Sequence, residues 1–106
     1  MSTATRYEHL VGLHVSDDET YTKYRAAMTP LLEAVGGFFR FDFTIDKTLK
    51  GGTDPEINRL FVISFPDQAT SERFFEEPAY VAAREQFFDA SVDMVERIAS
   101  FDHAEN

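Results

Sequence analysis

The sequence predicts an α+β fold of the ferredoxin-like βαββαβ type, with a four-stranded antiparallel sheet and two helices on one of its faces. Two segments have apolar residues at spacings of three and four, as amphipathic helices do, and four have the alternation or apolar composition of strands. They follow in the order strand, helix, strand, strand, helix, strand. The length of 106 residues fits one domain, so we assign 1–106 to a single unit and expect disordered tails at 1–5 and 102–106.

The first strand is expected at residues 6–15, where the side chains should alternate between the two faces of the sheet. One face would hold Tyr7, His9, Val11, Leu13 and Val15, and the other Glu8, Leu10, Gly12 and His14. The bulkier apolar set is expected to pack under the helices, so His14 should lie on the opposite face.

The first helix should begin after Ser16, which we expect to be its N-cap, with Glu19 completing a capping box. Its buried stripe is expected to contain Tyr21, Tyr24, Met28, Leu31 and Val35. Pro30 lies within this stripe and predicts a kink, because proline removes one backbone hydrogen bond and clashes with the preceding turn. The glycines at 36–37 predict the end of the helix.

The second half of the chain contains the other strands and the second helix. Strands are expected at 38–47, 57–65 and 92–101, with a glycine- and proline-containing loop between the first two. Asp67 is expected to cap the second helix, which is interrupted at 76–78 and begins again at Pro78. In the last strand, Val95, Arg97, Ala99 and Phe101 should share one face.

The third strand, INRLFVISF, is apolar on both faces, so both faces should be covered. The two helices can cover only one of them. We therefore expect a second sheet, most simply from an identical chain, to pack on the open face and give a homodimer.

Two stretches carry a resemblance to known proteins: DDETYTKYRAAMTPLLEAVGG at 17–37, with Pro30 just before LLEAVGG, and NRLFVISFPDQATSERFFEEPAY at 58–80. Together they resemble a family of small uncharacterised bacterial proteins in the dimeric α+β barrel superfamily, over residues 10–98. The resemblance implies a ferredoxin-like subunit whose sheet pairs with a second copy to close a barrel. Other branches of the superfamily include cofactor-independent monooxygenases, lactone isomerases and heme-handling enzymes.

The resemblance also concerns polar positions. That family often has an arginine shortly after the double glycine, a glutamate before the FP pair and an arginine in the last helix. The corresponding positions here hold Asp42, Ser64 and Phe87, whereas Arg59 matches a family arginine. The resemblance therefore implies that any site shared by the family is altered or lost in this chain.

Composition argues against several classes of partner. The net charge of −9, from 19 acidic and 10 basic side chains, disfavours nucleic acids and anionic membranes, and the third strand lacks the basic–glycine–aromatic signature of RNA-recognition modules. No cysteine, signal peptide or membrane-length apolar run is present, so we expect a cytoplasmic protein. His9 and His14 should face opposite sides of a strand, and we expect neither a metal nor a cofactor.

A candidate site follows from the alternation in the second strand. If Phe39, Phe41, Phe43 and Ile45 pack under the helices, Arg40, Asp42 and Thr44 face the other side, where His14 and Ser64 would join them. The candidate ligand-binding residues are His14, Arg40, Asp42, Arg59 and Ser64. An imidazole beside a carboxylate can act as a general base, and an arginine can hold an anion. Alternatively, Arg40 and Asp42 pair with each other or with a dimer mate at the rim of the sheet.

Three functions remain open from the sequence. The first is a barrel that binds a small apolar or weakly acidic metabolite. The second is a cofactor-independent enzyme of oxygenase or isomerase type, with His14 as its base. The third is a structural or regulatory dimer without a ligand. Whether the protein is an enzyme is left open.

Overall fold

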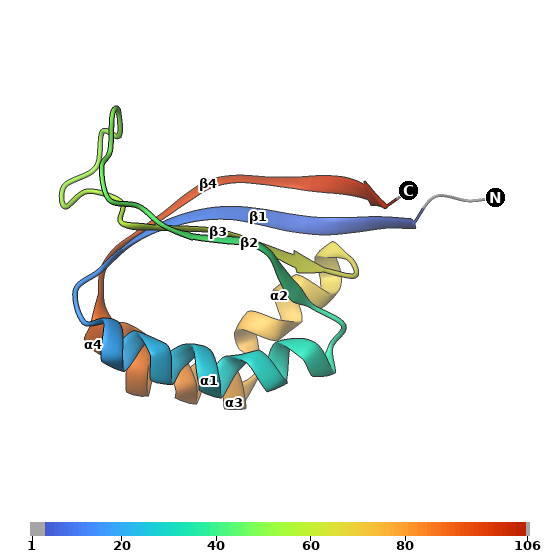
Figure 1. Ribbon diagram of the computed structural model, residues 1–106. Coiled ribbons are helices and arrows are strands. Elements are labelled where there is room, and N and C mark those ends of the chain that lie inside the picture. The colour runs from blue at the N-terminus through green and yellow to red at the C-terminus, as the bar shows by residue number, and fades with distance from the viewer. Residues whose placement is uncertain (1–3, 106) are drawn as a thin grey trace.

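The computed structural model describes residues 4–105 as a four-stranded antiparallel sheet with all helices on one face (Figure 1). The elements are β1 (Ala4–Val15), α1 (Asp18–Ala34), β2 (Phe38–Thr44), β3 (Arg59–Phe65), α2 (Gln68–Glu76), α3 (Pro78–Ala83), the π-helical turn η1 (Arg84–Phe88), α4 (Asp89–Ser91) and β4 (Val92–Glu105). The strand order β2-β3-β1-β4 is that of a ferredoxin-like fold, which confirms the predicted class. The predicted second helix is a series of short helical segments, from α2 to α4.

The helix ends follow local chemistry. Asp17, rather than the predicted Ser16, caps α1, and its carboxylate accepts a hydrogen bond from the Thr20 amide at 3.1 Å. The backbone amide of Ser16 instead donates to the Ser91 carbonyl at 2.8 Å, which ties this residue to the end of α4. The other predicted ends are confirmed. Gly36 leaves α1 with a φ of 80°, Asp67 caps α2, and Pro78 begins α3.

Helix α1 buries one stripe of side chains against the sheet, formed by Tyr21, Tyr24, Met28 and Leu32. Leu32 replaces the predicted Leu31, which is half-buried, because positions 28 and 32 are one helical turn apart. The helix continues through Pro30, which is exposed. The kink near Pro30 stays a prediction.

Strands β1 and β4 are longer than predicted. Ala4 pairs with Glu105, so residues 4–5 and 102–105, which were expected to be disordered, belong to the sheet. Residues 1–3 and 106 lie outside the described part. Because β3 pairs with β1 only from Tyr7 onward, the two longer strands continue past it as a projecting ribbon (Figure 1).

An irregularity in β2 changes which side chains face the helices. Phe39 pairs with Ile63 and Phe41 with Val62, so Arg40 is an extra residue in the ladder. Phe39 packs on the helix side against Phe61, at 5.4 Å between ring centroids. The expectation that Phe41 and Phe43 share that side was wrong, and Ile45 lies beyond the end of β2. Phe41 and Phe43 each remain 53% exposed and stack on each other on the open face.

A second irregularity in β4 has a similar effect. Leu10 pairs with Ala99 and Val11 with Arg97, so Ile98 is skipped. The predicted common face of the last strand is therefore split. Val95 and Arg97 share the helix side with Val11 and Leu13, whereas Ala99 and Phe101 lie on the open face with Leu10 and Glu8. The bulge thus allows Arg97 to line the space beneath the sheet.

In residues 4–105, no helix is long and apolar enough to cross a membrane.

Candidate functional site

Two of the predicted site residues, Arg40 and Ser64, lie on the open face beside the buried Glu8. The Arg40 Nε donates to Glu8 Oε2 at 2.8 Å, and the Arg6 Nε donates to Ser64 Oγ at 2.7 Å. Burial acts to raise the pKa of Glu8, but its hydrogen bonds with Arg40 and Ser64 outweigh that effect, and the pKa is lowered. Arg40 also pairs with Glu105. These groups satisfy one another's charges and hydrogen-bonding capacity, as expected of a structural ion pair.

His14 and Asp42 were expected to share the open face of the sheet, but they lie on opposite faces. His14 lies on the open face, and its Nδ1 donates to the Glu56 carbonyl at 2.7 Å. Asp42 pairs with Phe61 in the ladder and therefore faces the helices. The bulge at Arg40 inverts the direction of Asp42, so the sheet separates the two side chains.

Asp42 instead joins two arginines on the helix side of the sheet. Its carboxylate accepts two hydrogen bonds from each arginine. Two Arg25 nitrogens lie 2.9 and 3.1 Å from its oxygens, and two Arg59 nitrogens each lie 2.9 Å from them. Burial acts to raise the pKa of Asp42, but the arginine contacts dominate and lower it. Arg25 also stacks over the Phe39 ring at 3.8 Å and donates to the Tyr21 hydroxyl.

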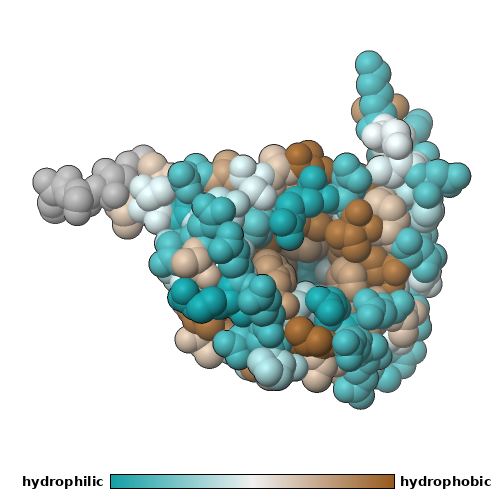
Figure 2. Space-filling view, turned by 180° about the vertical axis from the view of Figure 1, so that it is seen from behind, coloured by the Kyte–Doolittle hydropathy of each residue, from teal (hydrophilic) through white to brown (hydrophobic). Residues whose placement is uncertain are grey.

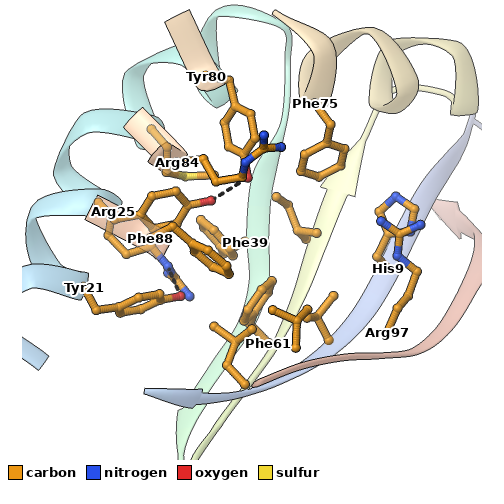
Figure 3. Close-up of a pocket in the computed structure, with 16 residues that line it drawn as sticks. His9, Tyr21, Arg25, Phe39, Phe61, Phe75, Tyr80, Arg84, Phe88 and Arg97 are labelled. Carbon is orange, nitrogen blue, oxygen red and sulfur yellow. Dashed lines mark hydrogen bonds between the residues drawn. The ribbon is translucent and has the colours of Figure 1, made fainter. Parts of the chain in front are cut away.

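A cavity of about 330 Å³ lies between the sheet and the helices (Figures 2 and 3). Seen from behind, it is a hollow with hydrophobic side chains around it (Figure 2). Its lining comprises His9, Val11, Leu13, Tyr21, Tyr24, Arg25, Met28, Phe39, Phe61, Ile63, Phe75, Tyr80, Arg84, Phe88, Val95 and Arg97. None of the five predicted site residues lines this cavity. The volume is at the lower end for small-molecule sites.

One polar part of the lining, the strand corner, consists of His9 of β1 and Arg97 of β4 (Figure 3). The His9 ring is 4% exposed, and its nitrogens hydrogen-bond the hydroxyl groups of Ser100 and Ser71 at 2.7 Å each. Burial, with a smaller effect of the Arg97 charge, lowers the pKa of His9 to about 4. The imidazole is therefore neutral at pH 7.

A second polar part, the helix corner, consists of Tyr24 of α1, Tyr80 of α3 and Arg84 of η1. Tyr80 and Arg84 are labelled in Figure 3. The two hydroxyl groups are 2.8 Å apart. Burial raises the pKa of both phenols, so they are protonated at neutral pH. The π-helical turn contributes both Arg84 and Phe88 to the lining, and such turns are frequent at functional sites.

The arginines of the cavity differ in their partners. Arg25 is paired with Asp42, as described above. Among residues 4–105, neither Arg84 nor Arg97 has a carboxylate within ion-pairing distance. Glu72 and Glu76 line a neighbouring hollow together with Arg97 but do not pair with it. The cavity therefore combines apolar walls with two guanidinium groups that lack an anion.

The alternation in the strands placed His9 on the helix face correctly. It did not predict these cavity residues, because the site was expected among the polar residues of the opposite face. The available signal was Arg84, a basic residue within the aromatic helical stretch that also contains Tyr80 and Phe88. No group of three metal-ligating side chains occurs within the described range, 4–105.

Comparison with known proteins places this architecture in a family. The profile of the DUF1330 domain of unknown function matches residues 9–97. The chain belongs to the DUF1330 family. No curated protein matches this DUF1330 sequence.

Solved structures share the fold of this DUF1330 chain at low sequence identity. A protein of unknown function from Rhodopseudomonas palustris superposes with a TM-score of 0.76 at 17% identity, over 97% of this chain and 84% of that one. A hydroxynitrile lyase from Passiflora edulis superposes with a TM-score of 0.63 at 14% sequence identity, over 95% of this chain and 94% of that one. A dimeric ferredoxin-like protein of unknown function from Thermobifida fusca superposes with a TM-score of 0.57 at 13% sequence identity, over 96% of this chain and 92% of that one. At these identities the likeness concerns the fold alone.

Proposed function

We propose that this DUF1330 protein binds a small, mainly apolar organic acid in the cavity between its sheet and its helices. The observation that carries the proposal is the apolar lining that includes Arg84 and Arg97, two cations with no carboxylate partner in residues 4–105. The sequence predicted a small apolar or weakly acidic ligand, and an organic acid is the narrower class proposed here. The proposed site lies on the helix side of the sheet rather than on its open face.

Electrostatics favours an anion at this place although the chain carries a net charge of −9. Arg84 is half-buried beside apolar walls and loses part of its hydration, and a carboxylate can replace the lost interactions with charge-assisted hydrogen bonds. Arg97 is exposed and would contribute its charge at the edge of the cavity. The apolar walls would then hold the hydrocarbon part of the ligand. The acidic exterior would disfavour large polyanions, so a small acid suits the site better than a nucleotide or a nucleic acid.

Binding is better supported than catalysis. His14, the base of the enzymatic alternative, does not line the cavity and is bonded to the Glu56 carbonyl. His9 does line it, but both of its ring nitrogens already have hydroxyl partners. A nitrogen that must give up such a partner before it accepts a proton is poorly prepared for general-base catalysis.

Calorimetric titration with benzoate and hexanoate, each compared with its neutral amide, tests the proposal. We expect both acids to bind at least about tenfold more tightly than their amides, because the amides lack the charge. Arg84→Gln and Arg97→Gln should each weaken acid binding, whereas Arg73→Gln, on the exposed face of α2 and outside this cavity, should not. Equal binding of acids and amides, or no binding of either acid, would contradict the proposal.

We also propose that a second copy covers the open face of the sheet. Four large apolar side chains there are more than a third exposed, namely Phe38, Phe41, Phe43 and Phe101. An apolar surface of this kind is typical of an interface, and a sheet face suits two-fold pairing with an identical face. The Thermobifida fusca neighbour is described as dimeric, which supports a dimer here without saying which face would pair.

A further inference from the structure

The helix corner points to a second oxygen atom on the ligand. We infer that Tyr24 and Tyr80 together donate one hydrogen bond to that oxygen, and that the ligand is an aromatic acid carrying a ring hydroxyl. This inference rests on the proposed function, because it concerns the same cavity.

The Tyr24–Tyr80 pair has one more hydroxyl proton than its own hydrogen bond uses. Two phenol groups have two O–H protons, and the contact of 2.8 Å between their oxygens uses one of them, whichever residue donates. No other protein group within residues 4–105 hydrogen-bonds either oxygen. Both side chains line the cavity, so the remaining proton can be donated to a molecule bound there.

The position of Arg84 is the second step. Its guanidinium group lies beside the Tyr80 ring (Figure 3) and has no carboxylate partner in the described part of the chain. A cation at this point favours an oxygen that carries partial or full negative charge. A phenolic oxygen fits both neighbours, since it accepts from the spare tyrosine proton and can donate its own proton back to a tyrosine oxygen.

The shape of the lining is the third step. Seven of the 16 lining residues are aromatic: Tyr21, Tyr24, Phe39, Phe61, Phe75, Tyr80 and Phe88. Their rings surround the space from both layers, and ring edges and faces pair well with another flat ring. An aromatic ring is therefore the apolar body that suits these walls.

The two polar corners lie on different layers of the molecule. Figure 3 shows His9 and Arg97 on the strands, and Tyr80 and Arg84 on the helical segments. A ring with a carboxylate at one position and a hydroxyl at another can bind the strand corner through the carboxylate and the helix corner through the hydroxyl. If the carboxylate is held by Arg97 in the strand corner, a ring without a hydroxyl would leave the spare tyrosine proton without a partner.

The test compares 2-, 3- and 4-hydroxybenzoate with the methylbenzoates of the same substitution pattern, using the wild-type protein and the variant Tyr24→Phe/Tyr80→Phe. At least one hydroxy isomer should bind wild type about tenfold more tightly than its methyl counterpart, as expected for one hydrogen bond in an apolar site. The double variant should bind each hydroxy isomer about as tightly as its methyl counterpart, because both hydroxyl groups are removed together and no unpaired one remains.

Tyrosine labelled with ¹³C at Cζ gives a second readout on the wild-type protein. The Tyr24 and Tyr80 resonances should shift with the preferred hydroxybenzoate and much less with its methyl counterpart. Hydroxy isomers that bind no more tightly than methyl isomers, or a preference that survives in the double variant, would overturn the inference while benzoate binding upholds the proposed function. If benzoate itself does not bind, the proposed function is refuted, and so is this inference, which rests on it.

Discussion

Asp42 and Arg25 form a bidentate ion pair between β2 and α1, with N–O distances of 2.9 and 3.1 Å. The same carboxylate holds Arg59, so removing its charge leaves two half-buried guanidinium groups without their anion. We expect Asp42→Asn to lower the free energy of unfolding by about 1–2 kcal/mol, which is less than for a fully buried pair because the Asp42 side chain is 31% exposed.

Urea denaturation at pH 7 measures this difference. Asp46→Asn removes the same charge from an exposed loop position and serves as the matched control. Because the pKa of Asp42 is lowered in the folded state, its contribution is present above the pKa of an unfolded aspartate and should decline as the pH falls. Equal effects of the two substitutions would show that the ion pair does not stabilise the fold.

The buried His9 should make the protein less stable in mild acid. Its folded-state pKa of about 4 lies below the ordinary value of 6.5, so between these values the unfolded chain binds more protons than the folded one. Stability should therefore fall as the pH drops from 6.5 to 4. The full effect is about 3 kcal/mol, at roughly 1.4 kcal/mol per pH unit.

Unfolding free energies of wild type and His9→Gln, measured from pH 7 to pH 4, isolate this effect. The carboxylates contribute equally to both proteins at low pH, so the difference between the two curves reports on His9. We expect the curves to converge as the pH falls. His14→Gln, at a solvent-accessible position, is the control. Parallel curves for wild type and His9→Gln would refute the prediction.

The Tyr24–Tyr80 pair should show strong coupling in a double-mutant cycle. Either single change to phenylalanine leaves one buried hydroxyl without its partner and should cost about 1–2 kcal/mol of unfolding free energy. The double change leaves no unpaired hydroxyl and should cost less than the sum of the singles. Chemical denaturation of the four proteins gives the coupling energy, and simple additivity would mean that the hydroxyl groups do not interact.

The open face should make the protein a dimer at micromolar concentration, as measured by light scattering. Phe41→Glu places a charge on this face at a side chain that is 53% exposed, so the subunit should fold and the dimer should dissociate. Ala26→Glu adds the same charge on the exposed surface of α1 and should leave the dimer intact. A monomeric wild-type protein would mean that the apolar face has another role.

Much of the fold follows from local patterns. Capping by Asp67, the left-handed Gly36 and the restart of the helix at Pro78 are set by neighbouring residues, and the sequence predicted each of them. The bulges at Arg40 and Ile98 depend instead on how a strand pairs with its neighbour. Strict alternation cannot reveal them, and each bulge reverses the facing of the residues on one side of it.

The site was harder to predict than the fold for the same reason. Arg40 and Asp42 are two residues apart, and without the bulge they would share a face. The cavity residues come from distant segments: His9 from β1, Tyr80 from α3 and Arg97 from β4. Their convergence depends on helix packing and strand register, which single-sequence patterns do not encode.

The location of a bound acid tests the central claim most directly. A crystal of the wild-type protein grown with 4-bromobenzoate should give an anomalous bromine peak in the cavity between the sheet and the helices, with the carboxylate within hydrogen-bonding distance of Arg84 or Arg97. A bromine peak on the open face, beside Arg40 and Ser64, would contradict the account and return the site to the opposite side of the sheet.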